Sequence, residues 1–235
     1  MTPPLLGIII PAYRAQDSLQ KFLPELLRKV PGIPVLVVDD GSADGTAGLC
    51  KNLGIECISF PENRGKGSAL YEGIRAGKAK CWEWALSMDA DGQHAAEDVP
   101  GFLNTAAHSE KIVGILAGKR EFRLGVMPFA RILSNRISTG MVSFLLKTDV
   151  YDAQCGFRAY RTSMLEKNIF PESGRFEWES AVLMNAVSNG FLLKPVPVQT
   201  IYFEDGGTHI SPVKDTIRFL RLLFRFWKHR KKIKN

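Results

Sequence analysis

Short apolar runs alternate with amphipathic segments along the first half of the chain. The apolar runs are rich in β-branched residues and end at proline, aspartate or phenylalanine, which is typical of buried strands. The segments between them repeat apolar residues every three or four positions, as helices do. Strands are expected at residues 6–11, 35–38, 56–60 and 83–88, with helices at 16–30, 43–53 and 67–77. This alternation predicts an α/β fold, with right-handed crossovers and a mainly parallel sheet that has helices on both faces.

The second half of the chain is less regular. Helices are expected at 98–108, 128–146 and 176–189, strands at 112–117 and 191–200, and a strand or turn at 152–160. We find no internal repeat and no linker in the sequence. The pattern therefore predicts one domain over residues 1–211, followed by a C-terminal helix over residues 212–235.

Residues 212–235 combine basic and apolar positions at helical spacing. The basic stripe comprises Arg218, Arg221, Arg225 and Lys228, and the other side comprises Leu220, Leu223, Phe224 and Trp227. This layout is typical of a helix in a membrane interface, with its basic residues toward anionic headgroups. The alternative is a helix that docks on the domain and leaves its charges in solvent. Nucleic acid is not an expected partner.

Composition and charge narrow the class of protein. Hydrophobic residues make up 45% and charged residues 23%, as in ordinary globular proteins. The net charge is +7, and residues 218–235 hold eight Lys or Arg and no acid, so the first 217 residues carry about −1. The basic charge therefore indicates a partner for the C-terminal helix.

The sequence also indicates where the protein acts. It contains no apolar stretch long enough to span a bilayer, no secretory signal and no C-x-x-C pair among its four cysteines. These features predict a cytoplasmic protein with reduced cysteines, held peripherally on the cytoplasmic membrane face.

Polar residues follow three of the predicted strands. Tyr13 follows the first strand, Asp40 the second, and Asp89 and Asp91 the fourth. Because ligands bind at the carboxyl ends of parallel strands, we expect these side chains to converge at one edge of the sheet. An aromatic ring and a carboxylate suit a nucleobase and ribose hydroxyls. Two carboxylates with one residue between them can share a divalent cation with diphosphate oxygens.

Simpler explanations exist for each cluster alone. Asp40-Gly41-Ser42 and Asp44-Gly45-Thr46 are also typical of a turn with helix caps. An Asp-x-Asp pair arises often by chance. Three such clusters, at the ends of the first, second and fourth predicted strands, favour a binding site.

Five segments occur in order between residues 8 and 161: I-I-P-A-Y, V-V-D-D-G-S-A-D-G-T, N-R-G-K-G-S-A-L, M-D-A-D-G-Q-H and D-A-Q-C-G-F-R-A-Y. Together they resemble the family 2 glycosyltransferases of the Rossmann-like GT-A fold, and within these the dolichyl- or polyprenyl-phosphate sugar transferases. The resemblance implies a UDP- or GDP-linked sugar donor and a Mg²⁺ or Mn²⁺ cofactor. It implies a polyprenyl phosphate or a lipid-linked glycan as acceptor.

The resemblance also assigns roles to individual residues. Nucleotide-sugar binding falls on Pro11, Tyr13, Val38, Asp40, Lys66, Asp89, Ala90 and Gln93, and metal binding on Asp89, Asp91 and Gln93. Asn63 and Gly65 match the segment beside the nucleotide, Arg120 matches an arginine that meets phosphate charge, and Asp152, Gly156, Phe157 and Arg158 match the acceptor-side segment.

Three positions depart from the family's mannosyl-phosphate members. Those members carry a glutamate, an arginine and a lysine where this chain has Ala15, Phe203 and His209. The changes remove a base or ribose contact and two cations, so the sugar and the nucleobase stay open. His94 and His209 are candidates either for extra metal ligands or for ordinary hydrogen-bonding side chains.

The implied reaction is a single displacement that inverts the anomeric carbon. Asp91, through the metal ion, and Arg120 would stabilise the leaving diphosphate. A lipid phosphate acceptor needs cations to position it, for which Arg123 and Arg131 are further candidates. A sugar hydroxyl needs a general base instead, and Glu177 and Glu179 are candidates for that role, although both also suit a helix N-terminus.

Three other functions fit parts of the sequence. A transferase acting on a sugar hydroxyl in cell-surface polysaccharide synthesis would use the same donor site. A membrane-associated scaffold could bind nucleotide sugar without catalysis. A nucleotidyltransferase usually places a glycine-rich basic loop after its first strand. This chain has Pro11-Ala12-Tyr13-Arg14 there instead, which disfavours that function.

Overall fold

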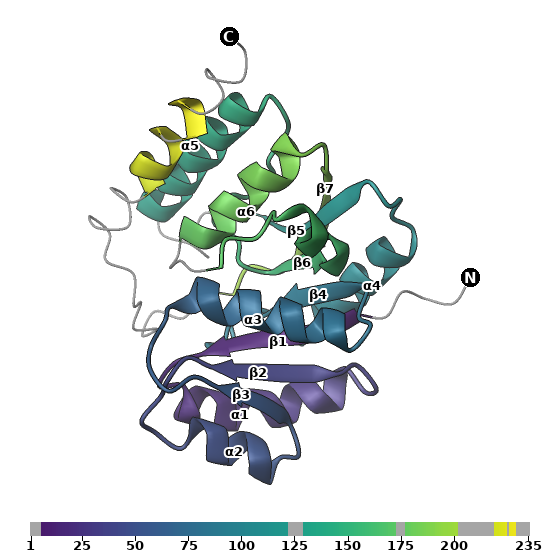
Figure 1. Cartoon of the computed structure of the whole chain (residues 1–235), viewed down its shortest axis with the longest axis vertical. Helices are drawn as coiled ribbons and strands as arrows, with labels where there is room; N and C mark the ends of the chain where they lie inside the picture. Colours follow the sequence, from purple (N-terminus) through teal and green to yellow (C-terminus); the bar gives the residue numbers. More distant parts are fainter. Residues whose placement is uncertain (1–5, 122–128, 173–176, 202–218, 225, 229–235) are drawn as a thin grey trace.

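The structure, a computed structural model, describes residues 6–121, 129–172, 177–201, 219–224 and 226–228 (Figure 1). The elements follow in the order β1 (Leu6–Ala12), α1 (Gln16–Lys29), β2 (Val35–Asp39), α2 (Thr46–Asn52), β3 (Glu56–Ser59), α3 (Lys66–Ala79), β4 (Trp84–Ser87), η1 (Ala96–Asp98), α4 (Val99–Ala107), β5 (Val113–Arg120), α5 (Phe129–Leu146), β6 (Arg158–Arg161), η2 (Thr162–Lys167), α6 (Glu177–Ser188) and β7 (Leu192–Val198). Residues 219–224 and 226–228 are also helical, and we call them the C-terminal helix.

A seven-stranded sheet forms the centre, in the order β3-β2-β1-β4-β6-β5-β7. Strand β6 pairs antiparallel with both β4 and β5, whereas the other neighbouring pairs are parallel. The predicted mainly parallel α/β sheet is therefore confirmed. Its strand ends at β1, β2 and β4 bring the three polar clusters to the same edge.

Helices cover both faces of the sheet because successive residues of each strand point to opposite sides. In β1, Ile8 and Ile10 belong to one buried cluster, with α1, α2 and α4, whereas Ile9 belongs to the other. That second cluster contains side chains from α3, α5, α6 and the C-terminal helix. The result is a three-layer arrangement (Figure 1).

The expected strand or turn at 152–160 is a loop followed by a short strand. Only Arg158–Arg161 forms β6. The side chain of Asp152 holds the preceding residues in a turn, since it accepts a hydrogen bond from the backbone N–H of Gln154 at 3.1 Å. The reversed strand begins beside the end of β4, where Arg158 pairs with Ser87.

The C-terminal helix packs on the domain through one side. Leu223 is buried, and Phe219, Leu222 and Phe226 pack against the same cluster as α5 and α6. The opposite side leaves Leu220, Phe224 and Trp227 exposed. The docked alternative therefore describes one side of this helix, and its other side remains apolar and open. Among the described residues, no helix has the length and apolarity that crossing a bilayer needs.

Candidate active site

The loops after β1 and β2 and the loop before α3 are bonded to one another. The carboxylate of Asp40 accepts hydrogen bonds from the backbone N–H groups of Arg64 at 2.7 Å and Gly65 at 2.8 Å. The hydroxyl of Ser42 accepts one from the backbone N–H of Arg14 at 2.8 Å. These bonds fix the edge of the sheet before any ligand binds.

Gly41 allows two of these loops to touch. Its φ is +72°, and a Cβ there would lie 2.4 Å from the carbonyl carbon of Glu62. A side chain at this position would therefore be strained and would also clash with backbone. Asp44, by contrast, has the local role that the simpler explanation gave it, because its Oδ1 accepts hydrogen bonds from the backbone and hydroxyl of Thr46.

Lys66, Asp89 and Glu179 meet in one charged cluster. The Nζ of Lys66 lies 2.6 Å from Oδ1 of Asp89 and 3.2 Å from Oε1 of Glu179. Lys66 begins α3, Asp89 follows β4, and Glu179 lies in the first turn of α6. The position of Glu179 thus does more than favour a helix N-terminus, since its side chain reaches the cluster at the edge of the sheet.

Gly156 closes this cluster from the side of β6. A Cβ at Gly156 would lie 3.0 Å from Oε1 of Glu179, 3.3 Å from Oδ2 of Asp89 and 3.3 Å from Nζ of Lys66. The reversed direction of β6 produces this approach, because its first residues lie against the end of β4. Glycine therefore lets the chain before β6 approach the three charged groups more closely than a residue with a side chain could.

The two aspartates of the Asp-x-Asp segment have opposite pKa shifts. Burial alone would raise the pKa of Asp89, but the positive charge of Lys66 is the main cause that lowers it overall. Reduced hydration and the negative charge of Asp89 raise the pKa of Asp91. Asp91 is exposed and has no cation beside it comparable to Lys66 among the described ion pairs. A bound cation would relieve the repulsion between the two carboxylates.

His94 contacts the backbone of Asp89. Its Nδ1 accepts a hydrogen bond from the backbone N–H of Asp89 at 2.9 Å, and its ring stacks on Phe157 at a centroid distance of 4.7 Å. Burial is the largest cause that lowers the pKa of His94, and Asp89 opposes it. The neutral ring with its proton on Nε2 fits both contacts.

Arg120 ends β5 and pairs with a buried carboxylate. Its Nε and one terminal nitrogen donate to the two oxygens of Asp152 at 2.8 and 3.1 Å. Asn135 of α5 donates to the same carboxylate at 2.9 Å. Asn135 was not among the residues expected at the site. Its possible role was indicated in the sequence only by the polar positions Asn135, Ser138 and Thr139 within an apolar helix.

Three residues that were expected to contact the donor or the acceptor have buried side chains. Arg158 is fully buried, and its guanidinium donates to the backbone carbonyls of Asp152, Ala153 and Glu179. Phe157 packs against His94 and Phe102, and the side chain of Val38 is buried in the core. The three side chains are buried in the described structure, and their assignment to the nucleobase or to the acceptor side stays a prediction.

The remaining expected residues lie along the same edge. Pro11 is buried within β1, whereas Tyr13 is exposed beneath the guanidinium of Arg14, 5.2 Å from its ring. Ala90 is partly buried. The backbone N–H of Gln93 donates to Asp91 at 2.9 Å, which closes a turn. Glu177 is partly buried at the start of α6.

Some expected residues lie outside the described residues. They are Arg123, the side chain of Arg131, Phe203 and His209.

The carboxylates fit a divalent cation in one respect. Oδ1 of Asp89 and Oε1 of Glu179 are buried against Nζ of Lys66, and among the described residues Oε2 of Glu177 is buried without a hydrogen-bond donor. Carboxylate oxygens are the ligands that Mg²⁺ and Mn²⁺ prefer. Within the described part of the chain, no three His, Cys, Asp or Glu residues enclose a metal position. A ligand such as diphosphate would have to complete the coordination.

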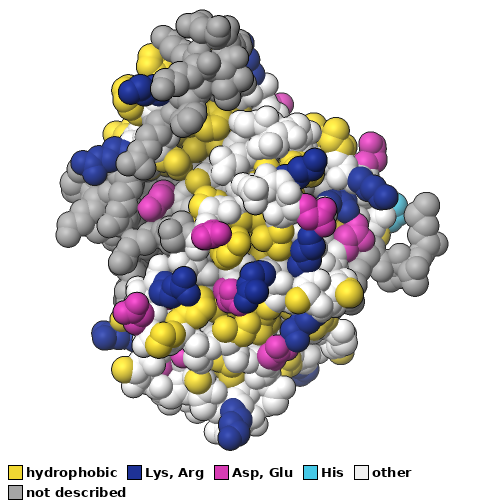
Figure 2. Space-filling model, viewed as in Figure 1, with side chains coloured by type: hydrophobic (Ala, Val, Ile, Leu, Met, Phe, Trp, Pro, Cys, Tyr) yellow, Lys and Arg dark blue, Asp and Glu magenta, His cyan; other side chains and the backbone are white. Residues whose placement is uncertain are grey.

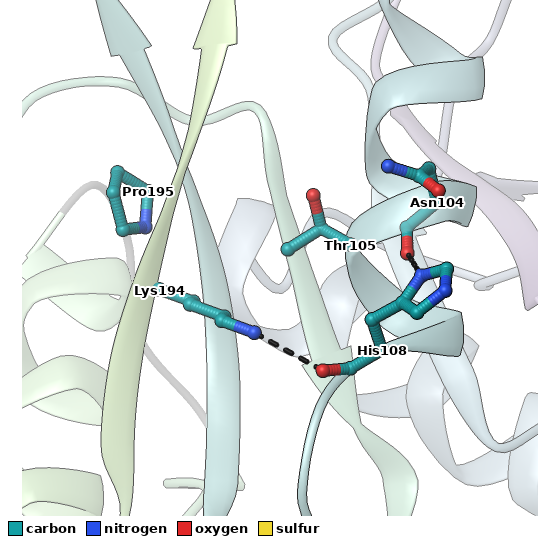
Figure 3. A pocket seen from close by; sticks show the side chains of 5 residues that line it. All are labelled: Asn104, Thr105, His108, Lys194 and Pro195. Carbon is teal, nitrogen blue, oxygen red and sulfur yellow. Dashed lines mark hydrogen bonds between the residues drawn. The ribbon is translucent and has the colours of Figure 1, made fainter.

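A hollow of about 550 Å³ lies away from these residues, between the end of α4 and β7 (Figure 3). It is lined by Asn104, Thr105, His108, Lys194 and Pro195. Lys194 donates to the backbone carbonyl of His108 at 3.2 Å, and none of the lining residues is acidic. The hollow contains none of the expected site residues.

Two known proteins are similar to this chain over most of its length. Polyprenol monophosphomannose synthase of Mycolicibacterium smegmatis is 28% identical over 87% of this chain and 80% of its own length. The UDP-N-acetylglucosamine–dolichyl-phosphate N-acetylglucosaminyltransferase of Methanococcus voltae is 29% identical over 87% of this chain and 88% of its own.

A solved structure shares the fold. Glucosyl-3-phosphoglycerate synthase of Mycobacterium tuberculosis, in complex with Mn²⁺, UDP-glucose and phosphoglyceric acid, superposes with a TM-score of 0.71 at 16% identity, covering 97% of this chain and 80% of that one. Residues 7–169 of this chain match the family described as Glycosyl transferase family 2. The chain belongs to that family and is a family 2 glycosyltransferase.

Proposed function

We propose that this protein transfers a sugar from a nucleoside-diphosphate sugar to a polyprenyl phosphate or a lipid-linked glycan at the cytoplasmic membrane face. The observation that carries the proposal is the cluster of Lys66, Asp89 and Glu179, which lies close against Gly156. Relatives that act on polyprenol and dolichyl phosphate support the acceptor.

The donor would lie along the edge formed by β1, β2 and β4. Tyr13, which is exposed, is available to stack on a base, and the loop held by Asp40 lines the way to Lys66. Asp89 and Asp91 would hold Mg²⁺ or Mn²⁺ together with the diphosphate. The bound metal would supply Lewis-acid stabilisation of the leaving group.

The protein's own residues would act on charge and position. Lys66 lies between Asp89 and Glu179 and would add positive charge beside the diphosphate, where charge grows in the transition state. His94 holds the backbone of Asp89, which keeps that carboxylate oriented. Arg120, held by Asp152, would meet phosphate oxygens of the donor or of the acceptor.

One observation favours the alternative acceptor, a sugar hydroxyl. Glu179 places Oε1 3.0 Å from the position that a Cβ of Gly156 would take, beside Nζ of Lys66 at 3.2 Å. A carboxylate at that place is suited to accept a proton from a hydroxyl. A phosphate acceptor is already an anion and needs no such base.

The outward side of the C-terminal helix supports a peripheral position on the membrane. Its exposed Phe224 and Trp227, with Arg221 and Lys228 nearby in the sequence, match a helix that lies in an anionic interface.

Purified full-length protein, supplied with Mn²⁺ and either UDP- or GDP-sugars, tests the proposal. Transfer to a polyprenyl phosphate, detected as a labelled lipid product, is expected. The variant Glu179→Gln separates the two acceptors, since a hydroxyl acceptor should lose at least about 100-fold in rate without its base, whereas a phosphate acceptor should lose much less. If the protein binds a nucleotide sugar but transfers to neither acceptor, the scaffold function replaces this proposal.

A further inference from the structure

Exposed apolar side chains gather on one part of the protein. Eleven large hydrophobic residues are exposed in the described part of the chain, and eight of them belong to α5 or to the C-terminal helix. They are Phe129, Leu133, Ile137, Met141 and Phe144 of α5, with Leu220, Phe224 and Trp227 of the C-terminal helix. Single exposed apolar residues are ordinary, but a concentration of this kind marks an interaction surface.

The five residues of α5 lie along one side of that helix. They follow one another at intervals of four and finally three positions, which keeps them on one side. Phe144 is 84% exposed and Phe129 is 68% exposed, so neither ring is used in packing the domain. The opposite side of α5 is buried through Ile132, Val142 and Leu146.

The C-terminal helix extends this surface. Figure 1 shows it running beside α5, and Leu223 shares a buried cluster with Val142 and Leu146 of α5. With Leu223 turned inward, Phe224 and Trp227 are left outside, with ring centroids 6.0 Å apart. In Figure 2, hydrophobic side chains appear at the upper left, over these two helices.

The charges on this surface have one sign. Residues 129–146 and 219–228 contain no Asp or Glu, and Arg136, Arg221 and Lys228 are exposed. Aromatic and aliphatic side chains among cations complement an anionic lipid interface. A second copy of the chain, docked through the same surface, would bring identical cations together, which disfavours association.

We propose that α5 and the C-terminal helix together form one lipid-facing surface, which we call the α5 surface, and that it lies in the headgroup region of an anionic bilayer. The proposal deepens the membrane association proposed above and rests on it. It assigns part of the membrane contact to α5, which belongs to the catalytic domain and not to the C-terminal helix. The inner side of the same helix holds Asn135, which bonds to Asp152 and so lies next to the partner of Arg120. The surface would therefore place the arginine end of the site close to the lipid.

Vesicle flotation of the full-length protein tests the α5 surface. The variant Leu133→Ser/Ile137→Ser/Phe144→Ser removes apolar area from α5 alone. Its matched control, Ile112→Ser/Leu192→Ser, changes residues that are 48% and 52% exposed elsewhere. With vesicles of phosphatidylcholine and phosphatidylglycerol, we expect the α5 variant to lose at least about tenfold in partitioning, because apolar burial drives interfacial binding. The control should float like wild type.

The outcomes separate the possible occupants. Flotation of the α5 variant at the wild-type level would overturn the proposal, whatever the C-terminal helix contributes to membrane binding. A wild-type dimer in sedimentation velocity, which the α5 variant converts to monomer without a change in flotation, would assign the surface to a second copy and also overturn it. Circular dichroism of the variant confirms that its fold is kept.

Failure of the proposed function would be recognised separately, because flotation needs neither donor nor acceptor. Wild-type protein that floats but transfers no sugar would contradict the activity alone. Transfer to a detergent-solubilised polyprenyl phosphate by an α5 variant that still floats would contradict the α5 surface alone.

Discussion

The two halves of the sheet hold their charged residues differently. At the ends of β1, β2 and β4, Asp40 fixes the loops and Asp89 pairs with Lys66, while Asp91 is exposed. On the side of β5 and β6, Arg120 and Arg158 are both engaged, one by Asp152 and the other by backbone carbonyls. The first half thus has loops fixed by Asp40 beside the proposed donor site, and the second half engages its arginines within the protein.

The bracing of the first half should be visible in stability. Replacing Asp40 with alanine leaves the backbone N–H groups of Arg64 and Gly65 without their acceptor. We expect the free energy of unfolding to fall by about 3 kcal/mol, since each buried unsatisfied donor costs about 1–3 kcal/mol. Urea denaturation measures the loss. Asp44→Ala, which removes the cap at Thr46 and an exposed hydrogen bond from the backbone of Gln16, should cost about 1 kcal/mol. Equal losses would show that Asp40 has no bracing role.

The close approach of Gly156 to the charged cluster should matter for activity more than for folding. A Cβ in Gly156→Ala would press on Glu179, Asp89 and Lys66. We expect about a 100-fold loss in kcat/KM, the scale that a misplacement of about 1 Å produces. Gly48→Ala is the control, because nothing lies within 4 Å of the Cβ that it adds. Wild-type activity in Gly156→Ala would place the ligand elsewhere.

The paired arginine of the second half should affect the acceptor more than the donor. In Asp152→Asn, Arg120 loses its charged partner but keeps one acceptor oxygen. We expect the KM for the lipid acceptor to rise about tenfold, a change of about 1.4 kcal/mol, with little change in nucleotide affinity. Steady-state kinetics with each substrate varied in turn makes the comparison. A larger effect on the donor would assign Arg120 to the diphosphate.

The smallest effect concerns the opposite pKa shifts of Asp91 and Asp44. A raised pKa means that ionised Asp91 destabilises the metal-free fold at neutral pH, and that this cost disappears as the pH falls through the raised pKa. Asp91→Asn should therefore stabilise the protein in chelator at pH 7, by less than about 1 kcal/mol because the group is exposed.

Asp44 gives the opposite sign. Burial would raise the pKa of Asp44, but hydrogen bonds from Thr46 and Gln16 lower it overall. Its ionised form stabilises the fold above the unfolded pKa and loses that effect as the pH falls through the folded one. Asp44→Asn should destabilise at pH 7, in thermal melts run beside Asp91→Asn. Shifts of the same sign in both variants would contradict this account of the two carboxylates.

The same contrast explains how far the sequence could predict the structure. The strand ends carrying Tyr13, Asp40 and Asp89 were predictable because short apolar runs lead directly into them. Arg158 was not, because its burial depends on β6 entering the sheet in reverse between two parallel strands. The partner of Arg120 lies 32 residues away, and no local pattern indicates that distance.

Two further features needed three dimensions. Glu177 and Glu179 look equivalent in sequence, but only Glu179 has an ion pair with Lys66 in the described residues. The C-terminal pattern predicted a helix, yet apolar residues on more than one side hid which of them would dock. Leu223 turned inward and Phe224 outward.

The most direct test of the central claim is the metal dependence of nucleotide binding. Isothermal titration would measure UDP and GDP binding to wild type and to Asp91→Ala, with Mn²⁺ and then with excess chelator. We expect Mn²⁺ to strengthen binding to wild type at least about tenfold, because the ion joins carboxylates to diphosphate oxygens, and to leave Asp91→Ala unchanged. Equal affinity of wild type with Mn²⁺ and in chelator would contradict a metal site at Asp89 and Asp91.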